Sequence, residues 1–125
     1  MPKDVRVPGP DHPITLEPTV ARVVVTAGGE TLADTTAALT LRESTYPAVQ
    51  YVPLDAIDPR FLKRTETSTY CPYKGDASYY SVVTDEGEVT DAVWTYEDPY
   101  EAVVAIKGYV AFYADRVQVS TESVA

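Results

Sequence analysis

The chain has 125 residues, a length typical of one domain, and 45% of them are hydrophobic, which is sufficient for one buried core. Its formal net charge is −9 and its pI is near 4.4. An acidic surface repels phosphate backbones and anionic lipids, and the ten basic residues are scattered along the chain, so we expect neither a nucleic-acid partner nor a membrane partner.

The first segment is rich in proline. Residues 1–18 contain five prolines, which lack an N–H group and restrict the residue before them. We therefore expect an extended arm over residues 1–13, with His12 as a surface residue. A single β domain is expected over residues 14–120, followed by a short tail, 121–125.

Short stretches of alternating apolar and polar residues follow the arm. In the first of them Val23 and Val25 alternate with Arg22 and Thr26, and Gly28-Gly29 then supplies turn residues. Similar stretches occupy residues 31–33, 39–42, 49–52, 65–70, 79–84, 89–96 and 109–120, the last interrupted near Ala114-Asp115, and residues 85–88 have the composition of a hairpin loop. Many short strands separated by turn residues predict a mainly β fold.

One segment has the pattern of a helix. Asp98 is a good N-cap, Pro99 suits the first helical position, and Glu101 follows three residues after the cap. Gly108 is a good residue just past the end. We therefore expect one short α-helix near residues 99–107, packed on the sheet, and a weaker helical turn over residues 58–62.

The single cysteine and single histidine limit the chemistry of the chain. A structural zinc site needs about four cysteine or histidine ligands, so we expect no metal and no cofactor. One cysteine cannot form an intramolecular disulfide, which favours a reducing compartment. The N-terminus has no signal-peptide pattern and no apolar run is long enough to span a membrane, so the expectation is a soluble, cytoplasmic protein.

The most distinctive stretch is residues 69–80. It contains Cys71, a lysine at Lys74, the turn-forming Pro72 and Gly75, and four tyrosines. A thiol and an amine at a tight turn among aromatic rings are typical of the wall of a binding site, although a plain hairpin with core tyrosines has the same composition.

From about residue 12 to residue 119 the chain resembles a bacterial family known as domain of unknown function 427. The residues that carry the resemblance are His12-Pro13-Ile14, Leu41-Arg42-Glu43, Tyr51-Val52-Pro53, Thr69 to Gly75, Ala77 to Tyr80, Ala92 to Tyr96, and Ile106 to Tyr113. The resemblance implies an Mss4-like, or β-tent, fold: two small antiparallel sheets packed together, with a short helix.

The family has no agreed activity to carry over. It is sometimes filed as nucleotidyltransferase-like, but this chain has neither a phosphate-binding Gly-rich loop followed by Lys-Ser/Thr nor a Gly-Ser pair followed by Asp-x-Asp. Several β-tent relatives hold zinc with two Cys-x-x-Cys pairs, and this chain has none.

We expect the site at a cleft near residues 71–80 and Trp94. The candidates for catalysis are Cys71, Lys74 and Glu43, and the candidates for ligand binding are Tyr51, Tyr79, Trp94, Tyr96 and Tyr113. A lysine beside exposed backbone N–H groups suits an anion, and tyrosine suits a ligand pocket as well as a core.

Three functions remain open at this stage. The leading hypothesis is binding of a small anionic or aromatic molecule. The first alternative is an enzyme of thiol or general acid–base type that uses Cys71, Lys74 and Glu43. The second is a non-catalytic protein-interaction domain that forms a homodimer through an exposed strand edge.

Overall fold

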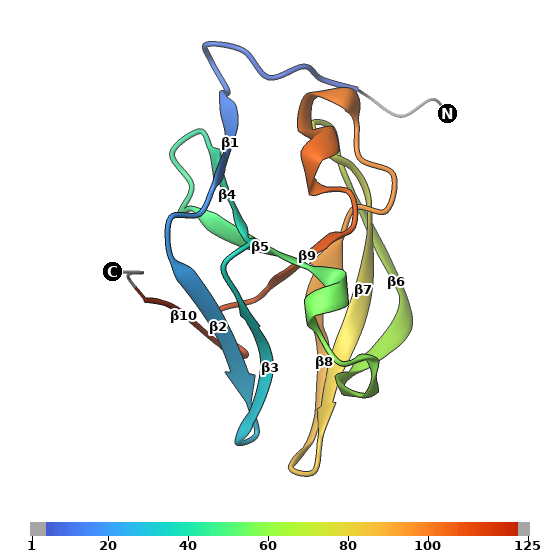
Figure 1. Cartoon of the computed structure of the whole chain (residues 1–125). Helices are drawn as coiled ribbons and strands as arrows, with labels where there is room; N and C mark the ends of the chain where they lie inside the picture. The colour runs from blue at the N-terminus through green and yellow to red at the C-terminus, as the bar shows by residue number, and fades with distance from the viewer. Residues whose placement is uncertain (1–4, 123–125) are drawn as a thin grey trace.

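The computed structural model describes residues 5–122, in which short strands and 3₁₀ turns alternate along the chain (Figure 1). The strands are β1 (Ile14–Pro18), β2 (Arg22–Ala27), β3 (Glu30–Thr35), β4 (Leu39–Glu43), β5 (Val49–Pro53), β6 (Leu62–Cys71), β7 (Gly75–Thr84), β8 (Gly87–Thr95), β9 (Tyr109–Phe112) and β10 (Gln118–Glu122). The 3₁₀ segments are η1 (Leu54–Ala56), η2 (Pro59–Phe61) and η3 (Glu101–Ile106). The predicted mainly β fold is confirmed.

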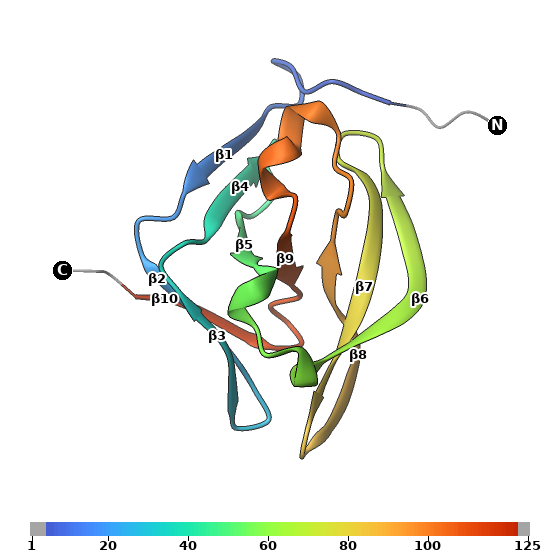
Figure 2. The same ribbon diagram turned by 45° about the vertical axis from the view of Figure 1, so that its right-hand side comes forward.

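The strands of the described residues form two antiparallel sheets. The larger has the order β1-β4-β5-β9-β8-β7-β6, and the smaller has the order β10-β2-β3. Figure 1 shows β2, β3 and β10 below β1 and β4, and Figure 2 shows β6 and β7 on the opposite side of the molecule from β1 and β4. The Mss4-like name for this arrangement stays a prediction.

Neighbouring side chains along a strand of the larger sheet point to opposite faces and belong to two different apolar clusters. On β9, Val110 and Phe112 pack in the cluster that also contains Val23 and Val25 of the smaller sheet, whereas Ala111 packs in a second cluster. The members of this second cluster are Leu41, Tyr51, Ala77, Tyr79, Tyr96, Val103, Ile106 and Ala111. Because successive side chains of a strand point to opposite faces, the second cluster covers the face away from the smaller sheet.

The predicted stretch 109–120 is divided between the two sheets. β9 pairs with β5 and β8 in the larger sheet, and β10 pairs with β2 in the smaller one. A turn between them is closed by hydrogen bonds from the N–H groups of Arg116 and Val117 to the carbonyl of Tyr113. β10 includes residues 121 and 122, the first two of the predicted tail.

The predicted α-helix near residues 99–107 is a 3₁₀ segment that starts later. η3 begins at Glu101 after an extended Tyr100, and Asp98 does not cap it. The physical reason is tertiary: the Tyr100 N–H donates to the carbonyl of Lys74 at 3.0 Å, which holds the segment on the β6–β7 turn. Gly108 has φ 84° just past the end, as predicted.

The weaker helical turn is present as η2. Its N-cap is Asp58, whose carboxylate accepts a hydrogen bond from the Arg60 N–H at 3.0 Å. In the described part of the chain no helix is long and apolar enough to cross a membrane.

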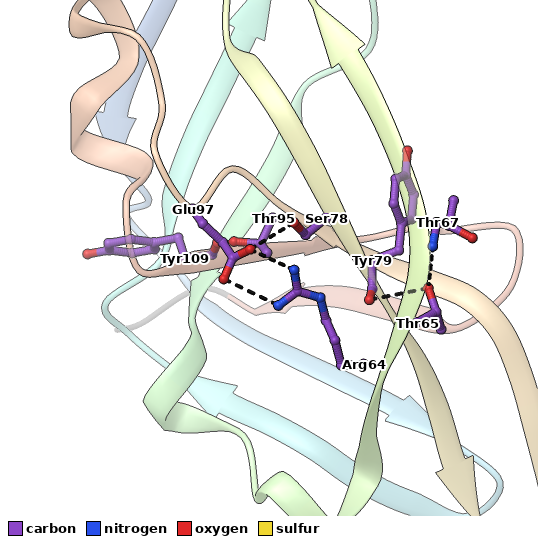
Figure 3. Close-up of polar contacts among 8 residues, drawn as sticks. All are labelled: Arg64, Thr65, Thr67, Ser78, Tyr79, Thr95, Glu97 and Tyr109. Carbon is purple, nitrogen blue, oxygen red and sulfur yellow. Dashed lines mark hydrogen bonds and ion pairs between the residues drawn. The ribbon is translucent and has the colours of Figure 1, made fainter.

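Polar contacts fix β6 and β7 against the rest of the larger sheet (Figure 3). Arg64 and Ser78 both donate to the carboxylate of Glu97, and the Thr65 hydroxyl donates to the carbonyl of Tyr79. The Thr95 hydroxyl in turn donates to the carbonyl of Tyr109, which joins β8 to β9. These bonds hold the strand that carries Tyr79, one wall of the cavity described next.

Candidate functional site

A cavity of about 270 Å³ lies on the face of the larger sheet covered by the second apolar cluster. Its lining residues come from β4, β5, β7 and β8, from the β6–β7 turn, and from segments that follow β4, β8 and β9. They are Leu41, Glu43, Tyr46, Pro47, Val49, Tyr51, Lys74, Tyr79, Trp94, Tyr96 and Tyr113. Seven of the eight residues predicted for the site lie in this list, and Cys71 is the exception. The fold thus brings together residues from positions 43 to 113.

A charged cluster forms part of the cavity wall. The Lys74 ammonium donates to Oε1 of Glu43 at 2.5 Å, and Nε2 of His12 lies 2.7 Å from Oε2 of the same carboxylate. The side chains of Lys74 and Glu43 are only 12% and 13% exposed. Burial alone would raise the pKa of Glu43, but the hydrogen bonds from Lys74 and His12 outweigh it and hold that pKa below its ordinary value.

The β6–β7 turn places Lys74 at the cavity. Cys71 and Gly75 pair across the turn, the Lys74 N–H donates to the carbonyl of Cys71, and Gly75 has φ 111°. A side chain is strained at this φ, which explains the glycine. A Cβ on Gly75 would also lie 3.4 Å from the carbonyl oxygen of Asp98, so the turn packs closely on the segment before η3.

The N-terminal arm closes one side of the charged cluster. The ring of His12 stacks on that of Tyr73, with 4.2 Å between centroids and 8° between planes. The Arg6 N–H donates to the carbonyl of Pro72 at 2.8 Å, and Figure 1 shows the arm passing from the side of β6 and η3 to β1. His12, expected at the surface, is instead partly buried and bound to a candidate site residue.

Aromatic rings form most of the remaining wall. Trp94 lies 4.6 Å from Tyr113 between ring centroids, and its Nε1–H donates to the Tyr51 hydroxyl at 3.2 Å. The ring of Tyr96 lies 5.8 Å from the Lys74 ammonium, within the range of a cation–π contact. The Tyr79 hydroxyl is hydrogen-bonded to that of Thr69 on β6.

Three phenols in this wall, those of Tyr51, Tyr96 and Tyr113, stay protonated at neutral pH. Burial raises the pKa of Tyr51 and of Tyr96 well above its ordinary value, and the negative charge of Glu43 adds to both shifts. Burial, with a hydrogen bond and repulsion from Tyr79, raises the pKa of Tyr113 to about 12. The cavity therefore presents O–H groups rather than phenolates.

Cys71 lies beside the cavity rather than in its wall. It is partly buried and packs against the second apolar cluster. Lys74, the other catalytic candidate in this turn, is bound to Glu43, and His12 is bound to the same carboxylate. Within residues 5–122 the thiol has no basic side chain bound to it, so the geometry gives a thiol mechanism no support.

Several lining residues lie outside the predicted set. Tyr46, Pro47 and Val49 lie in or beside the turn that follows Glu43, and only their closeness to Glu43 in sequence could have suggested them. His12 was singled out as the lone histidine, but its distance of 31 residues from Glu43 gives no sequence signal of contact. No group of three or more metal-ligating side chains occurs in the described part of the chain.

A larger groove of about 750 Å³ lies elsewhere, among η1, η2, β7 and β9. It is lined by Pro53, Leu54, Asp55, Ile57, Pro59, Leu62, Tyr80, Gly108 and Tyr109. Its lining is mainly apolar and has Asp55 as its one charged side chain, with no cation to oppose it. We take the smaller cavity as the candidate site because polar and aromatic groups converge there.

The comparisons with known proteins give a family and no activity. The model of the family described as a domain of unknown function, DUF427, matches residues 15–123, which is most of the chain. No curated protein matches the sequence.

Proposed function

The chain belongs to the DUF427 family, whose description states no function, and we propose from the geometry of the cavity that it binds a small molecule with an aromatic ring or an anionic group. The observation that carries the proposal is the wall itself. Trp94, Tyr96 and Tyr113 supply ring surfaces, and Lys74 supplies a cation in the same cavity.

The size of the cavity limits the ligand. Its volume of about 270 Å³ is close to the lower end of the roughly 300–1,000 Å³ found for small-molecule sites. A molecule with a single ring is the best match. Stacking and edge contacts with the aromatic wall would hold the ring, because aromatic pairs favour offset and edge-to-face arrangements.

Trp94 provides the assay, because it is the only tryptophan of the chain and it lines the cavity. We expect at least one of benzoate, benzamide, benzylamine and ethylbenzene to change its fluorescence saturably. Val49→Phe, which places a ring in the cavity, should weaken that binding at least tenfold, since each 1.4 kcal/mol of lost contact is about tenfold in affinity.

The matched control is Val104→Phe, because Val104 is 56% exposed on η3 and does not line the cavity. This variant should bind as the unaltered protein does. Saturation-transfer NMR of the same compounds would exclude an optical artefact. If none of the four compounds binds at millimolar concentration, or if the two variants bind alike, the proposal is wrong.

General acid–base catalysis is the second candidate function. It is favoured by the contact of one carboxylate, Glu43, with both Lys74 and His12, because paired titratable groups in a cavity are typical of such enzymes. If the protein converts a bound compound and the Glu43→Gln variant does not, catalysis becomes the better-supported function.

The interaction domain has less support at the β6 edge of the larger sheet. The β6 edge carries Lys63, Arg64 and Glu66, and its pairing with β7 shifts register between Arg64 and Ser68. Charges and bulges protect an edge strand from pairing with another chain.

A further inference from the structure

Two phenols in the cavity wall, those of Tyr51 and Tyr96, have hydroxyl protons that no group within residues 5–122 accepts. The Tyr51 oxygen accepts the Nε1–H of Trp94, but among residues 5–122 no side chain or carbonyl accepts the Tyr51 proton. The Tyr96 hydroxyl has no hydrogen bond to any of these residues. Tyr51 and Tyr96 are only 1% and 7% exposed, so little bulk water reaches them.

The Tyr96 hydroxyl must face the cavity. In the described part of the chain, every side-chain nitrogen or oxygen that is fully enclosed has a hydrogen-bond partner. The hydroxyl of Tyr96 has none, so it must touch accessible space, and the cavity is the space that this buried residue lines. Because the hydroxyl opens onto the cavity, a molecule bound there can accept its proton.

The cavity as a whole is richer in donors than in acceptors. Tyr51 and Tyr96 offer two O–H groups that stay protonated at neutral pH. Lys74 carries three N–H donors, of which one goes to Glu43. Each oxygen of Glu43 already accepts one bond, from Lys74 or His12. The free donors of the wall therefore suit a ligand that is itself an acceptor.

The charge of the wall is compatible with an anion. Glu43 and Lys74 are the one carboxylate and the one cation among its lining residues, and their charges cancel. A cationic ligand would lie near the Lys74 ammonium, which already occupies the region over the Tyr96 ring at 5.8 Å. Two cations there would repel each other, so Lys74 disfavours the binding of a cationic ligand to the aromatic wall.

We infer that the ligand is a small aromatic carboxylate, its ring against Trp94 and its carboxylate accepting hydrogen bonds from the hydroxyls of Tyr51 and Tyr96 beside Lys74. The inference rests on the proposed function and names the ligand class for the same cavity. A carboxylate is an acceptor-only group, and its charge strengthens each bond that it accepts.

The test compares four single-ring compounds on the unaltered full chain, followed by Trp94 fluorescence: benzoate, the neutral acceptor benzamide, the cation benzylamine, and ethylbenzene, which has no acceptor. Benzoate should bind roughly tenfold more tightly than benzamide, because hydrogen bonds to an ionised acceptor are about twice as strong. Benzylamine and ethylbenzene should bind more weakly still.

Tyr96→Phe removes the donor and keeps the ring. It should weaken benzoate binding roughly tenfold to a hundredfold, the loss expected for a hydrogen bond to a charged group. Ethylbenzene binding should change little. Tyr80→Phe removes a hydroxyl from a residue that lines the larger groove and not the cavity, so it is the matched control and should leave benzoate binding unaltered.

The outcomes separate this inference from the proposed function. If aromatic compounds bind but benzamide or benzylamine binds as tightly as benzoate, the inference that the ligand is a carboxylate is wrong. The proposed binding of aromatic molecules is then still supported. An equal benzoate affinity in Tyr96→Phe also overturns the inference. If no compound binds, both fail. A urea unfolding curve checks that Tyr96→Phe is folded, and if it is not, the compound series on the unaltered protein decides.

Discussion

Replacing Glu43 with glutamine removes the carboxylate that neutralises Lys74. The ammonium would then remain with a side chain only 12% exposed and no opposite charge beside it. Losing one partner of a buried pair costs about 3–5 kcal/mol, whereas an exposed pair contributes about 0.2–1 kcal/mol. Because water reaches this pair through the cavity, we expect an intermediate loss of about 2–3 kcal/mol in the free energy of unfolding. Urea denaturation at neutral pH measures it.

Two further variants test whether the lost stability comes from the unpaired charge of Lys74. Glu43→Gln combined with Lys74→Met removes both charges, and it should recover most of the lost stability because no unpaired ammonium remains. Glu88→Gln breaks the Lys63–Glu88 pair at 3.5 Å, whose side chains are 64% and 41% exposed. That control should cost less than about 0.5 kcal/mol.

The effect must also depend on pH with a definite sign. The folded state holds the pKa of Glu43 below its ordinary value of 4.5, so the carboxylate contributes stability that is complete above the unfolded pKa. This contribution is lost as the pH falls through the lower folded pKa. The difference between the unaltered protein and Glu43→Gln should therefore be full at pH 7 and shrink below about pH 4.5. A difference at pH 7 smaller than about 0.5 kcal/mol, or a double variant as unstable as the single one, would refute the reasoning.

Three other predictions concern the fold around the cavity. Ile106→Ala should lower the free energy of unfolding by about 2–5 kcal/mol because Ile106 is fully buried, while Val104→Ala on the exposed side of η3 should be nearly neutral in the same urea titration. Asp58→Ala should lower the free energy of unfolding by about 0.5–2 kcal/mol through loss of the η2 cap. Asp98→Ala should lower it by less than about 0.5 kcal/mol, because Asp98 does not cap η3. A larger loss in Asp98→Ala than in Asp58→Ala would indicate that Asp98 is a cap. Gly75→Ala should cost about 1–3 kcal/mol, because φ is 111° there; an unchanged thermal midpoint would contradict the strain.

Local pattern was sufficient for most of the strands. Alternating side chains located β2 and β7, because buried residues alternate with less buried ones along most of each strand. Gly28-Gly29 and residues 85–88 gave the hairpins, since positive φ at Gly28, Gly29 and Gly87 follows from residue type. The distinctive stretch 69–80 supplied Lys74 as a candidate, and Glu43 is among the residues that carry the family resemblance.

Tertiary contacts decided what local rules could not. The cap pattern at Asp98 predicted a helix start, but the bond from the Tyr100 N–H to the Lys74 carbonyl keeps that segment extended, and η3 begins only at Glu101. Cys71 and Lys74 are three residues apart, yet only Lys74 lines the cavity, because the turn between them reverses the chain.

The charged cluster depends most strongly on the fold. His12 and Lys74 each lie 31 residues from Glu43 in sequence, and both meet its carboxylate because β1 pairs with β4 while the β6–β7 turn reaches the same place. Residue types determined which groups were available to a site. Strand pairing and the closing arm determined which of them share a cavity, because such contacts join segments whose separation leaves no periodic signal in the sequence.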